Sequence, residues 1–240
     1  MFKSKNATVS AVLWDFDGTI ANTMAKNYSI IKKIYPIINP NIKKENWPNA
    51  LTSLNAYIKA EYESINWIDC FENQVGFTKN QIELVKSLWD NIASKDKTNI
   101  KIFNGLSDIF NNLKIPHGIC SQNSSKNILN VLKKHEIDHH FISIIGNKEI
   151  QNQKPHPESF LLSIKNMKIK EGLIFYIGDH EEDVMFAKNA EIALDKMGYN
   201  FKILSIGACY SGSNTKLWKI QPDYIATNSE EILKIIYNDK

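Results

Sequence analysis

Runs of apolar residues alternate with polar segments along this 240-residue chain, and their lengths predict its strands and helices. Short apolar runs predict buried strands, whereas apolar residues spaced three and four apart predict helices. The pattern predicts strands over 9–14, 117–120, 141–145, 173–177 and 201–206. Between the later strands it predicts helices over 124–135, 157–167 and 181–197. This alternation favours a doubly wound α/β domain with a parallel sheet.

Residues 22–94 have a different pattern, which is helical throughout and contains no predicted strand. Apolar residues at helical spacing predict helices over 25–35, ending before Pro36, and over 50–65. Thr78 and Gln81 match a capping box, after which another helix is expected. We therefore expect an all-helical domain over residues 21–98, inserted into an α/β core domain made of residues 1–20 and 99–240.

Two carboxylates, Asp15 and Asp17, directly follow the first predicted strand. Side chains at i and i+2 of a strand share a face, and two carboxylates about 4 Å apart repel by roughly 4 kcal/mol at an effective dielectric constant near 20. Such a pair persists if a cation neutralises it, if one member is protonated, or if the chain turns the two apart. Gly18 permits a sharp turn, and the Thr19 hydroxyl can bond a phosphate or the other Asp. An ordinary Asp-rich turn is the alternative.

Polar residues also follow three later strands, where ligands bind in open parallel sheets. The sequence Ser121-Gln122-Asn123 suits either a phosphate or the N-cap of the next helix. Lys154 precedes Pro155 and Pro157, and a proline suits the first turn of a helix, so we expect this lysine to be held in place.

Four acidic residues lie within Gly178–Asp183, after the strand over 173–177. Helix capping and the helix dipole account for Glu181 and Glu182, but they account less well for Asp179. Because Mg²⁺ prefers carboxylates, water and phosphate oxygens, Asp179 together with Asp15 makes a plausible metal site.

Composition narrows the partners that we expect. All 29 basic residues are lysine, so bidentate capture of an anion by arginine is excluded. A net charge of +3 is too small to indicate nucleic acid, and 43% hydrophobic residues is ordinary for a soluble protein. Three distant cysteines, Cys70, Cys120 and Cys209, favour reduced thiols over a disulfide framework.

The cellular compartment is predicted from two features that the sequence lacks. Residues 2–10 are polar, so no signal peptide is expected, and no apolar run is long enough to span a membrane. Together with the cysteine usage, these features lead us to expect a cytoplasmic protein.

Taken together, these segments resemble the four motifs of the haloacid dehalogenase-like superfamily. Asp15-Phe16-Asp17-Gly18-Thr19 is similar to the first motif, and the later motifs are matched by Ser121, by Lys154, and by Asp179 with Asp183. The helical insert resembles the cap of this superfamily, and Asn104-Gly105-Leu106 adds a likeness to phosphoglycolate phosphatase-like hydrolases. Asn22 departs from the pattern, since relatives commonly place Asp shortly after the first motif.

The resemblance implies a Mg²⁺-dependent phosphomonoester hydrolase that acts on a small phosphorylated metabolite through an aspartyl-phosphate. It implies Asp15 as the nucleophile and Asp17 as the general acid and base. Mg²⁺ would be bound by Asp15, the main-chain carbonyl of Asp17 and Asp179, with help from Asp183. The residues expected to bind phosphate are Thr19, Ser121, Gln122 and Lys154.

Two other functions remain open on the same fold. One is a phosphomutase of the β-phosphoglucomutase type, and the other is a catalytically idle binding or regulatory protein. Dehalogenation is disfavoured because it does not need the second carboxylate, which Asp17 supplies. The substrate and the oligomeric state are not predicted.

Two further patterns are interpreted as coincidences. His135-Glu136-Ile137-Asp138-His139 matches a zinc-protease pattern, which needs one continuous helix, yet the predicted helix ends near His135. The glycines of 207–212 are spaced as in a P-loop, but the required lysine is missing. We expect a loop there that borders the active site.

Overall fold

The computed structural model of the protein describes residues 8–238. Within this range the chain forms two compact units: one contains the residues up to Ala21 and from Ile102 onward, and the other spans Asn22–Lys101. The chain passes between them in two short strands, β2 (Ala21–Asn22) and β3 (Lys101–Ile102), which pair with each other. The segment in which we expect no signal peptide lies mostly outside the described residues.

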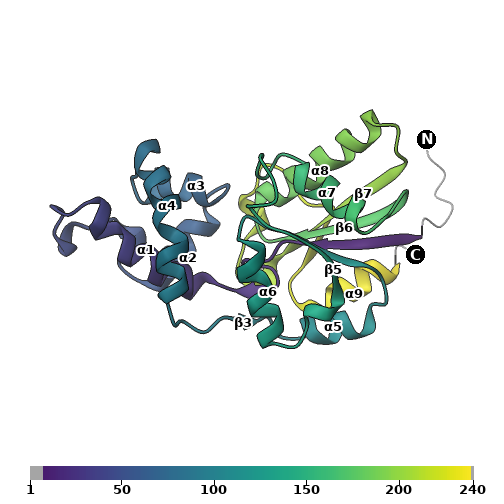
Figure 1. The fold of residues 1–240 in the computed structure, drawn as a ribbon, viewed down its shortest axis with the longest axis horizontal. Coiled ribbons are helices and arrows are strands. Elements are labelled where there is room, and N and C mark those ends of the chain that lie inside the picture. The colour runs from purple at the N-terminus through teal and green to yellow at the C-terminus, as the bar shows by residue number, and fades with distance from the viewer. Residues whose placement is uncertain (1–7, 239–240) are drawn as a thin grey trace. The chain divides into compact units, whose positions relative to one another are not determined.

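The α/β unit is built on a six-stranded sheet in the order β5-β4-β1-β6-β7-β8, in which every pairing is parallel (Figure 1). Its strands are β1 (Val9–Trp14), β4 (His117–Cys120), β5 (Phe141–Ile145), β6 (Gly172–Gly178), β7 (Phe201–Ala208) and β8 (Tyr224–Ala226). From β1 the sheet is extended on both sides, through β4 and through β6. The carboxyl end of β1 therefore lies at a topological switch point, where doubly wound folds bind their ligands.

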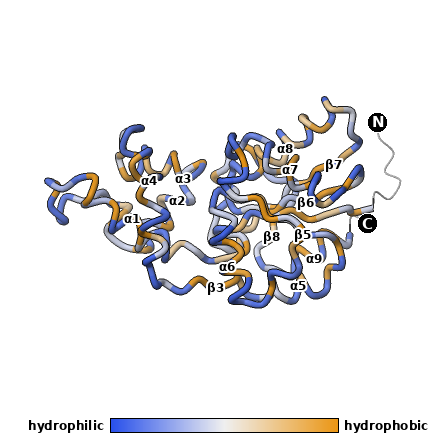
Figure 2. Tube along the Cα trace, viewed as in Figure 1, coloured by the Kyte–Doolittle hydropathy of each residue, from blue (hydrophilic) through white to orange (hydrophobic). Residues whose placement is uncertain are grey.

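Side chains alternate between the two faces of β1 and pack against different helices. Leu13 belongs to a core with Phe160 and Phe186, which lie in two helices on one face of the sheet, while Trp14 contacts Phe110 edge to face. The helices of this unit are α5 (Leu106–Asn112), α6 (Ser125–Lys134), α7 (Glu158–Asn166), α8 (Glu181–Lys196) and α9 (Ser229–Asn238). Hydrophobic stretches along the central strands, visible in Figure 2, supply the core between the helical layers. The predicted doubly wound α/β fold is confirmed.

The second unit is helical, as its pattern predicted. It contains α1 (Met24–Ile38), α2 (Leu54–Tyr62), α3 (Trp67–Asp69), a π-helical turn over Cys70–Gln74 and α4 (Lys79–Lys95). These helices enclose a hydrophobic core of their own. The predicted capping box is present: the Thr78 hydroxyl accepts from Gln81 N, and Gln81 Oε1 accepts from Thr78 N.

The predicted boundaries of two helices in the helical unit were wrong. Helix α1 continues through Pro36 to Ile38, because Ile38 packs on the core of the helical unit and Pro36 falls in the last turn. The helix expected over 50–65 is shortened to α2, after a separate 3₁₀ turn at Asn49–Leu51. The three-residue strand β8 was not predicted, since so short a run carries little pattern.

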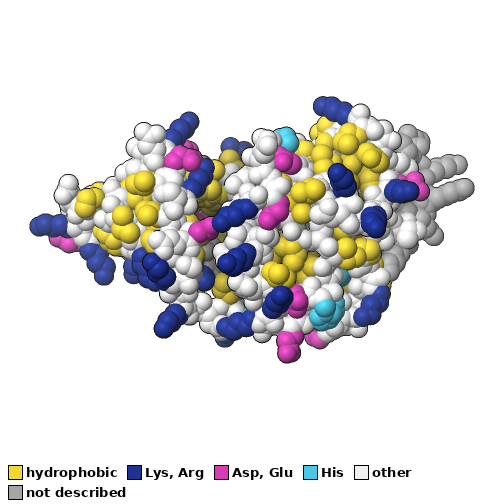
Figure 3. All heavy atoms as spheres, in the orientation of Figure 1, with side chains coloured by type: hydrophobic (Ala, Val, Ile, Leu, Met, Phe, Trp, Pro, Cys, Tyr) yellow, Lys and Arg dark blue, Asp and Glu magenta, His cyan; other side chains and the backbone are white. Residues whose placement is uncertain are grey.

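Membrane-spanning helices, the distribution of lysines and the state of the cysteines were also considered in the sequence. No helix among the described residues is long and apolar enough to cross a membrane. Lysines lie scattered among acidic and neutral side chains on the face shown in Figure 3. All three cysteines are free; Cys70 and Cys120 are buried, but Cys209 is only half-buried.

Candidate active site

Three neighbouring strands place acidic and polar residues at one edge of the sheet. Asp15 follows β1, and its N–H donates to the carbonyl of Ile177 in β6 at 2.8 Å. Ser121 follows β4 and is fixed in the same way, by donation to the carbonyl of Ile145 at 3.0 Å. Asp179 follows β6. Ladder hydrogen bonds between the strands therefore hold the polar residues that follow them.

The buried Lys154 forms ion pairs with two of the carboxylates, those of Asp15 and Asp183. Its Nζ lies 2.6 Å from Oδ1 of Asp15 and 2.8 Å from Oδ1 of Asp183. The Tyr176 hydroxyl also donates to Asp183 Oδ1, at 3.2 Å. Burial disfavours a charged lysine, but the two carboxylates outweigh it and hold the pKa of Lys154 well above its usual range.

Carboxylates outnumber ammonium groups around Asp15. Burial raises the pKa of Asp15 well above its ordinary value; Lys154 opposes this, while Asp183, Asp179 and Asp17 reinforce it. A single lysine thus does not neutralise the four carboxylates. Additional positive charge at this site would favour the ionised form of Asp15.

Asp179 is fully buried and has one oxygen without a hydrogen bond. Its Oδ1 accepts from the Thr19 hydroxyl at 2.9 Å, whereas Oδ2 has no hydrogen-bond partner among the described residues. Gly18 makes room for this oxygen: its φ is +78°, and a Cβ there would lie 2.1 Å from Asp179 Oδ2. A buried, unbonded carboxylate oxygen in a site rich in carboxylates fits a hard divalent cation such as Mg²⁺.

Asp183, by contrast, is fully engaged. Besides the two contacts to Oδ1, its Oδ2 accepts from the main-chain N–H of His180 at 3.1 Å. Gly178 is needed beside it, because a Cβ at that position would lie 2.2 Å from Asp183 Cγ. Asp183 therefore holds Lys154 and the first turn of α8 in place.

Asp17 contacts the segment that follows β4. Ser121 Oγ lies 3.5 Å from Asp17 Oδ2, and Asn123 Nδ2 donates to both carboxylate oxygens, at 3.2 and 3.1 Å. The N-cap of α6 is Ser124, which leaves the Asn123 side chain to bind Asp17. From the sequence, Asn123 belonged to a segment suited either to a phosphate or to the helix cap, and its contact with Asp17 was not predicted.

Two residues expected to bind phosphate have protein partners here. The Thr19 hydroxyl donates to Asp179, and Gln122 Nε2 donates to Glu182 Oε2 at 2.6 Å. Ser121 lies beside Asp17, and Lys154 lies beside Asp15. Roles in phosphate binding remain predictions for all four.

A tyrosine that we did not single out also reaches the site. Strand β7 continues to Ala208, and a 3₁₀ turn over Cys209–Ser211 follows it, in the loop expected to border the active site. The Tyr210 hydroxyl donates to the carbonyl of Thr19 at 2.8 Å. Burial, together with the nearby Asp179 and Asp15, raises the pKa of Tyr210 well above its usual value. The contact was not predicted because Tyr210 and Thr19 are 191 positions apart in the sequence.

The zinc-protease pattern is not supported by the geometry. Helix α6 ends at Lys134, and Glu136 has a φ of 59°, in the left-handed region. His135 and His139 therefore do not lie on one face of a continuous helix, which the pattern requires.

Comparisons with known proteins give relatives in sequence and neighbours in fold. Phosphoglycolate phosphatase of Vibrio parahaemolyticus is 26% identical over 112 residues, which cover 47% of this chain and 45% of the relative. That of Escherichia coli K12 is 25% identical over 130 residues, 51% of each chain. The chain thus spans about half the length of the curated relatives it matches. A haloacid dehalogenase-like hydrolase of Streptococcus pneumoniae has a similar fold, with a TM-score of 0.69 and 18% identity, covering 95% of this chain and 98% of that one.

The family model for haloacid dehalogenase-like hydrolases matches residues 12–194, about three quarters of the chain. This range contains the strand ends that carry Asp15, Ser121 and Asp179, together with Lys154. The chain belongs to the haloacid dehalogenase-like hydrolase family.

Proposed function

We propose that the protein is a Mg²⁺-dependent phosphomonoester hydrolase that acts on a small phosphorylated metabolite. The observation that carries this proposal is the buried Lys154, whose Nζ lies within 2.8 Å of the carboxylates of both Asp15 and Asp183. Asp179, with its unbonded Oδ2, adds a group suited to a cation. Phosphoryl transfer depends mainly on positioning and on electrostatic stabilisation of this kind.

Asp15 is assigned as the nucleophile. Lys154 contacts Oδ1 of Asp15, and we assign the attack on phosphorus to Oδ2. The bond between phosphorus and the substrate's alcohol oxygen breaks as the aspartyl-phosphate forms. The Lys154 ammonium group and the Ser121 hydroxyl are assigned to the oxygens of the transferred phosphoryl group.

Asp17 is assigned as the general acid and base. It protonates the leaving alcohol oxygen in the first step, and in the second it takes a proton from the water that attacks phosphorus. The bond from phosphorus to Asp15 then breaks and inorganic phosphate leaves. Asn123 and Ser121 hold the Asp17 carboxylate from one side.

Asp15 and Asp179 would hold the Mg²⁺ ion, with the main-chain carbonyl of Asp17, while Asp183 supports the site through Lys154. When bound, the ion supplies positive charge to the phosphoryl oxygens. We assign Thr19 to orienting Asp179, because its hydroxyl proton is directed to Oδ1 of that carboxylate. We further propose that the helical unit, Asn22–Lys101, is a cap that selects the substrate.

The Asp15→Asn substitution tests the nucleophile. We expect Mg²⁺-dependent release of phosphate from p-nitrophenyl phosphate to fall below detection, with an unchanged circular dichroism spectrum. The matched control is Asp17→Asn, for which we expect a loss of about 10²–10⁴-fold. Acid quenching with ³²P-labelled substrate should give labelled protein with the wild type and none with Asp15→Asn. Near-normal turnover by Asp15→Asn contradicts the assignment.

The relatives named phosphoglycolate phosphatase suggest where a substrate search begins. We propose phosphoglycolate as the first compound of a panel of phosphorylated metabolites. The same panel, followed for isomerised sugar phosphates as well as for free phosphate, separates a hydrolase from a phosphomutase.

A further inference from the structure

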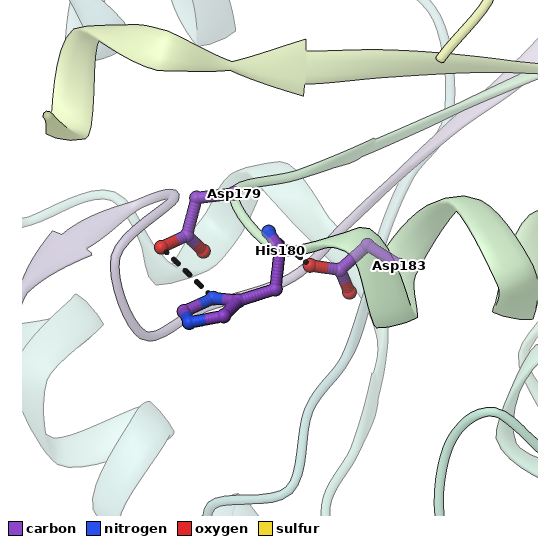
Figure 4. Close-up of side chains that lie close together, drawn as sticks. All are labelled: Asp179, His180 and Asp183. Atoms are coloured by element: carbon purple, nitrogen blue, oxygen red, sulfur yellow. Dashed lines mark hydrogen bonds and ion pairs between the residues drawn. The ribbon is translucent and has the colours of Figure 1, made fainter. Parts of the chain in front are cut away.

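His180 follows Asp179 between β6 and α8, and its side chain is directed to the Asp179 carboxylate (Figure 4). Its Nδ1 lies 3.3 Å from Asp179 Oδ2, and its side chain also accepts from the main-chain N–H of Asp183 in the capping box of α8. Ligand atoms of Asp179, His180 and Asp183 all lie within 4.8 Å of one another. The imidazole side chain is 18% exposed, whereas the Asp179 carboxylate is fully buried.

The other carboxylate oxygens of this group already have partners. Asp183 accepts from Lys154 and Tyr176 through Oδ1 and from His180 N through Oδ2. Asp179 Oδ1 accepts from Thr19. Asp179 Oδ2 is thus the one oxygen of these two carboxylates that lacks a hydrogen bond within the described range 8–238, and it is the oxygen nearest to the imidazole.

The spacing of these two atoms suits a pair of ligands on one ion. Neighbouring ligands of an octahedral ion with bonds of about 2.1 Å lie about 3.0 Å apart. Asp179 Oδ2 and His180 Nδ1, at 3.3 Å, are close to that separation. The missing Cβ of Gly18 makes room for Oδ2 itself, since a Cβ there would lie 2.1 Å from that oxygen.

We propose that His180 Nδ1 is a metal ligand beside Asp179, which gives this site a mixed nitrogen and oxygen donor set. The inference rests on the proposed divalent-metal site, and it extends that proposal to the choice of metal. Carboxylate and carbonyl oxygens suit Mg²⁺ and Mn²⁺, whereas imidazole strengthens binding of Co²⁺, Ni²⁺ and Zn²⁺. The site therefore favours transition ions over Mg²⁺ more strongly than one built from oxygen donors alone.

The His180→Asn substitution separates the nitrogen ligand from the rest of the site. Asparagine can begin α8 as an N-cap residue and offers an oxygen in place of the nitrogen. Titration calorimetry with CoCl₂ and with MgCl₂ measures the two affinities on the full chain. Electron spin echo envelope modulation of bound Mn²⁺ detects a coordinated ¹⁴N directly. His139→Asn, at an exposed histidine, is the matched control.

We expect wild type and His139→Asn to show ¹⁴N modulation and His180→Asn to lose it. We also expect His180→Asn to bind Co²⁺ about tenfold or more weakly and to change Mg²⁺ affinity by less than about threefold. Modulation that is absent from the wild type, or that survives in His180→Asn, overturns the proposal. Equal weakening of Co²⁺ and Mg²⁺ also overturns it, since His180 would then only orient Asp179 by a hydrogen bond.

The Asp179→Asn variant distinguishes this failure from failure of the proposed function. Loss of Mg²⁺ binding in Asp179→Asn, together with normal metal preference in His180→Asn, rejects the nitrogen ligand and leaves the hydrolase proposal standing. A wild-type protein that binds neither Mg²⁺ nor Co²⁺ overturns both.

Discussion

The two units of this protein bury charge in different ways. In the helical unit, the buried Asp96 accepts from Lys33 Nζ and Ser29 Oγ, both at 2.6 Å, and the buried Glu61 accepts from the Tyr57 hydroxyl. In the α/β unit, Lys154 is the single buried lysine among the described residues, and it lies in a group with three buried carboxylates, those of Asp15, Asp179 and Asp183.

This difference separates charges that serve the fold from charges that serve a ligand. A buried charge is costly unless it is paired and hydrogen-bonded. Asp96 meets that condition with groups of its own unit, so it is explained by the fold alone. The excess of carboxylates around Lys154 is explained if a bound cation completes the site.

The largest effect is expected from Lys154→Met, which removes the ammonium group and leaves its carboxylate partners buried. Removing one member of a buried ion pair typically costs about 3–5 kcal/mol, so we expect the free energy of unfolding in urea with EDTA to fall by this amount. Millimolar Mg²⁺ should recover part of the loss, because it binds the folded state and supplies positive charge. If the free energy of unfolding fell by less than about 1 kcal/mol, or if Mg²⁺ recovered none of the loss, the two units would not differ in the way proposed.

A second test concerns His117, a buried group of the α/β unit outside the active site. Trp14 Nε1 donates to its Nδ1 at 3.1 Å, so Nε2 carries the proton and donates to the carbonyl of Leu113 at 3.2 Å. Burial lowers the pKa of His117 from 6.5 to about 4. The stability linked to a neutral His117 is therefore full above pH 6.5 and is lost as the pH falls toward about 4.

For the wild type, this linkage predicts that His117 alone lowers the free energy of unfolding by about 3 kcal/mol as the pH falls from 6.5 to about 4. His117→Asn keeps an acceptor for Trp14 but does not titrate, so its free energy of unfolding should fall less steeply between pH 6.5 and pH 4. Urea denaturation at a series of pH values measures both curves. Parallel curves would show that His117 is not the group responsible.

Much of the fold follows directly from the sequence, because buried parallel strands are continuous apolar runs. The strand ends then place Asp15, Lys154 and Asp183 together, since the carboxyl ends of parallel strands meet at one edge of the sheet. The spacing of apolar residues also separated the helical stretch from the α/β stretch.

Other parts of the site depend on contacts that local patterns do not encode. Tyr210 reaches the carbonyl of Thr19 across 191 positions of sequence. Asn123 binds Asp17 because Ser124 takes the N-cap position, and the sequence favours neither residue for the cap. Pro36 stays inside α1 because packing of the residues after it outweighs the lost hydrogen bond.

The smallest effect is expected in the helical unit, from Lys33→Met. Burial opposes ionisation of Asp96, but the hydrogen bonds from Lys33, Ser29 and Thr98 outweigh it and hold the pKa of Asp96 well below its ordinary 3.8. Lys33 is half-exposed, and Ser29 and Thr98 remain as donors after the substitution. We therefore expect the free energy of unfolding at neutral pH to fall by about 1 kcal/mol, with no recovery on adding Mg²⁺.

The Lys33→Met substitution should also change how the free energy of unfolding depends on pH. A carboxylate whose pKa is lowered by folding stabilises the protein above its ordinary value, near pH 3.8, and loses that contribution as the pH falls further. Without Lys33 the pKa of Asp96 is lowered less, so the Lys33→Met curve should be flatter than the wild-type curve below pH 4. Lys59→Met is the matched control, because its exposed pair with Glu63 spans 3.7 Å and should change stability by less than about 0.5 kcal/mol. Mg²⁺ could also raise the free energy of unfolding of Lys33→Met as much as that of Lys154→Met. Metal binding would then not distinguish the two buried networks, and the excess of carboxylates around Lys154 would no longer indicate a ligand site.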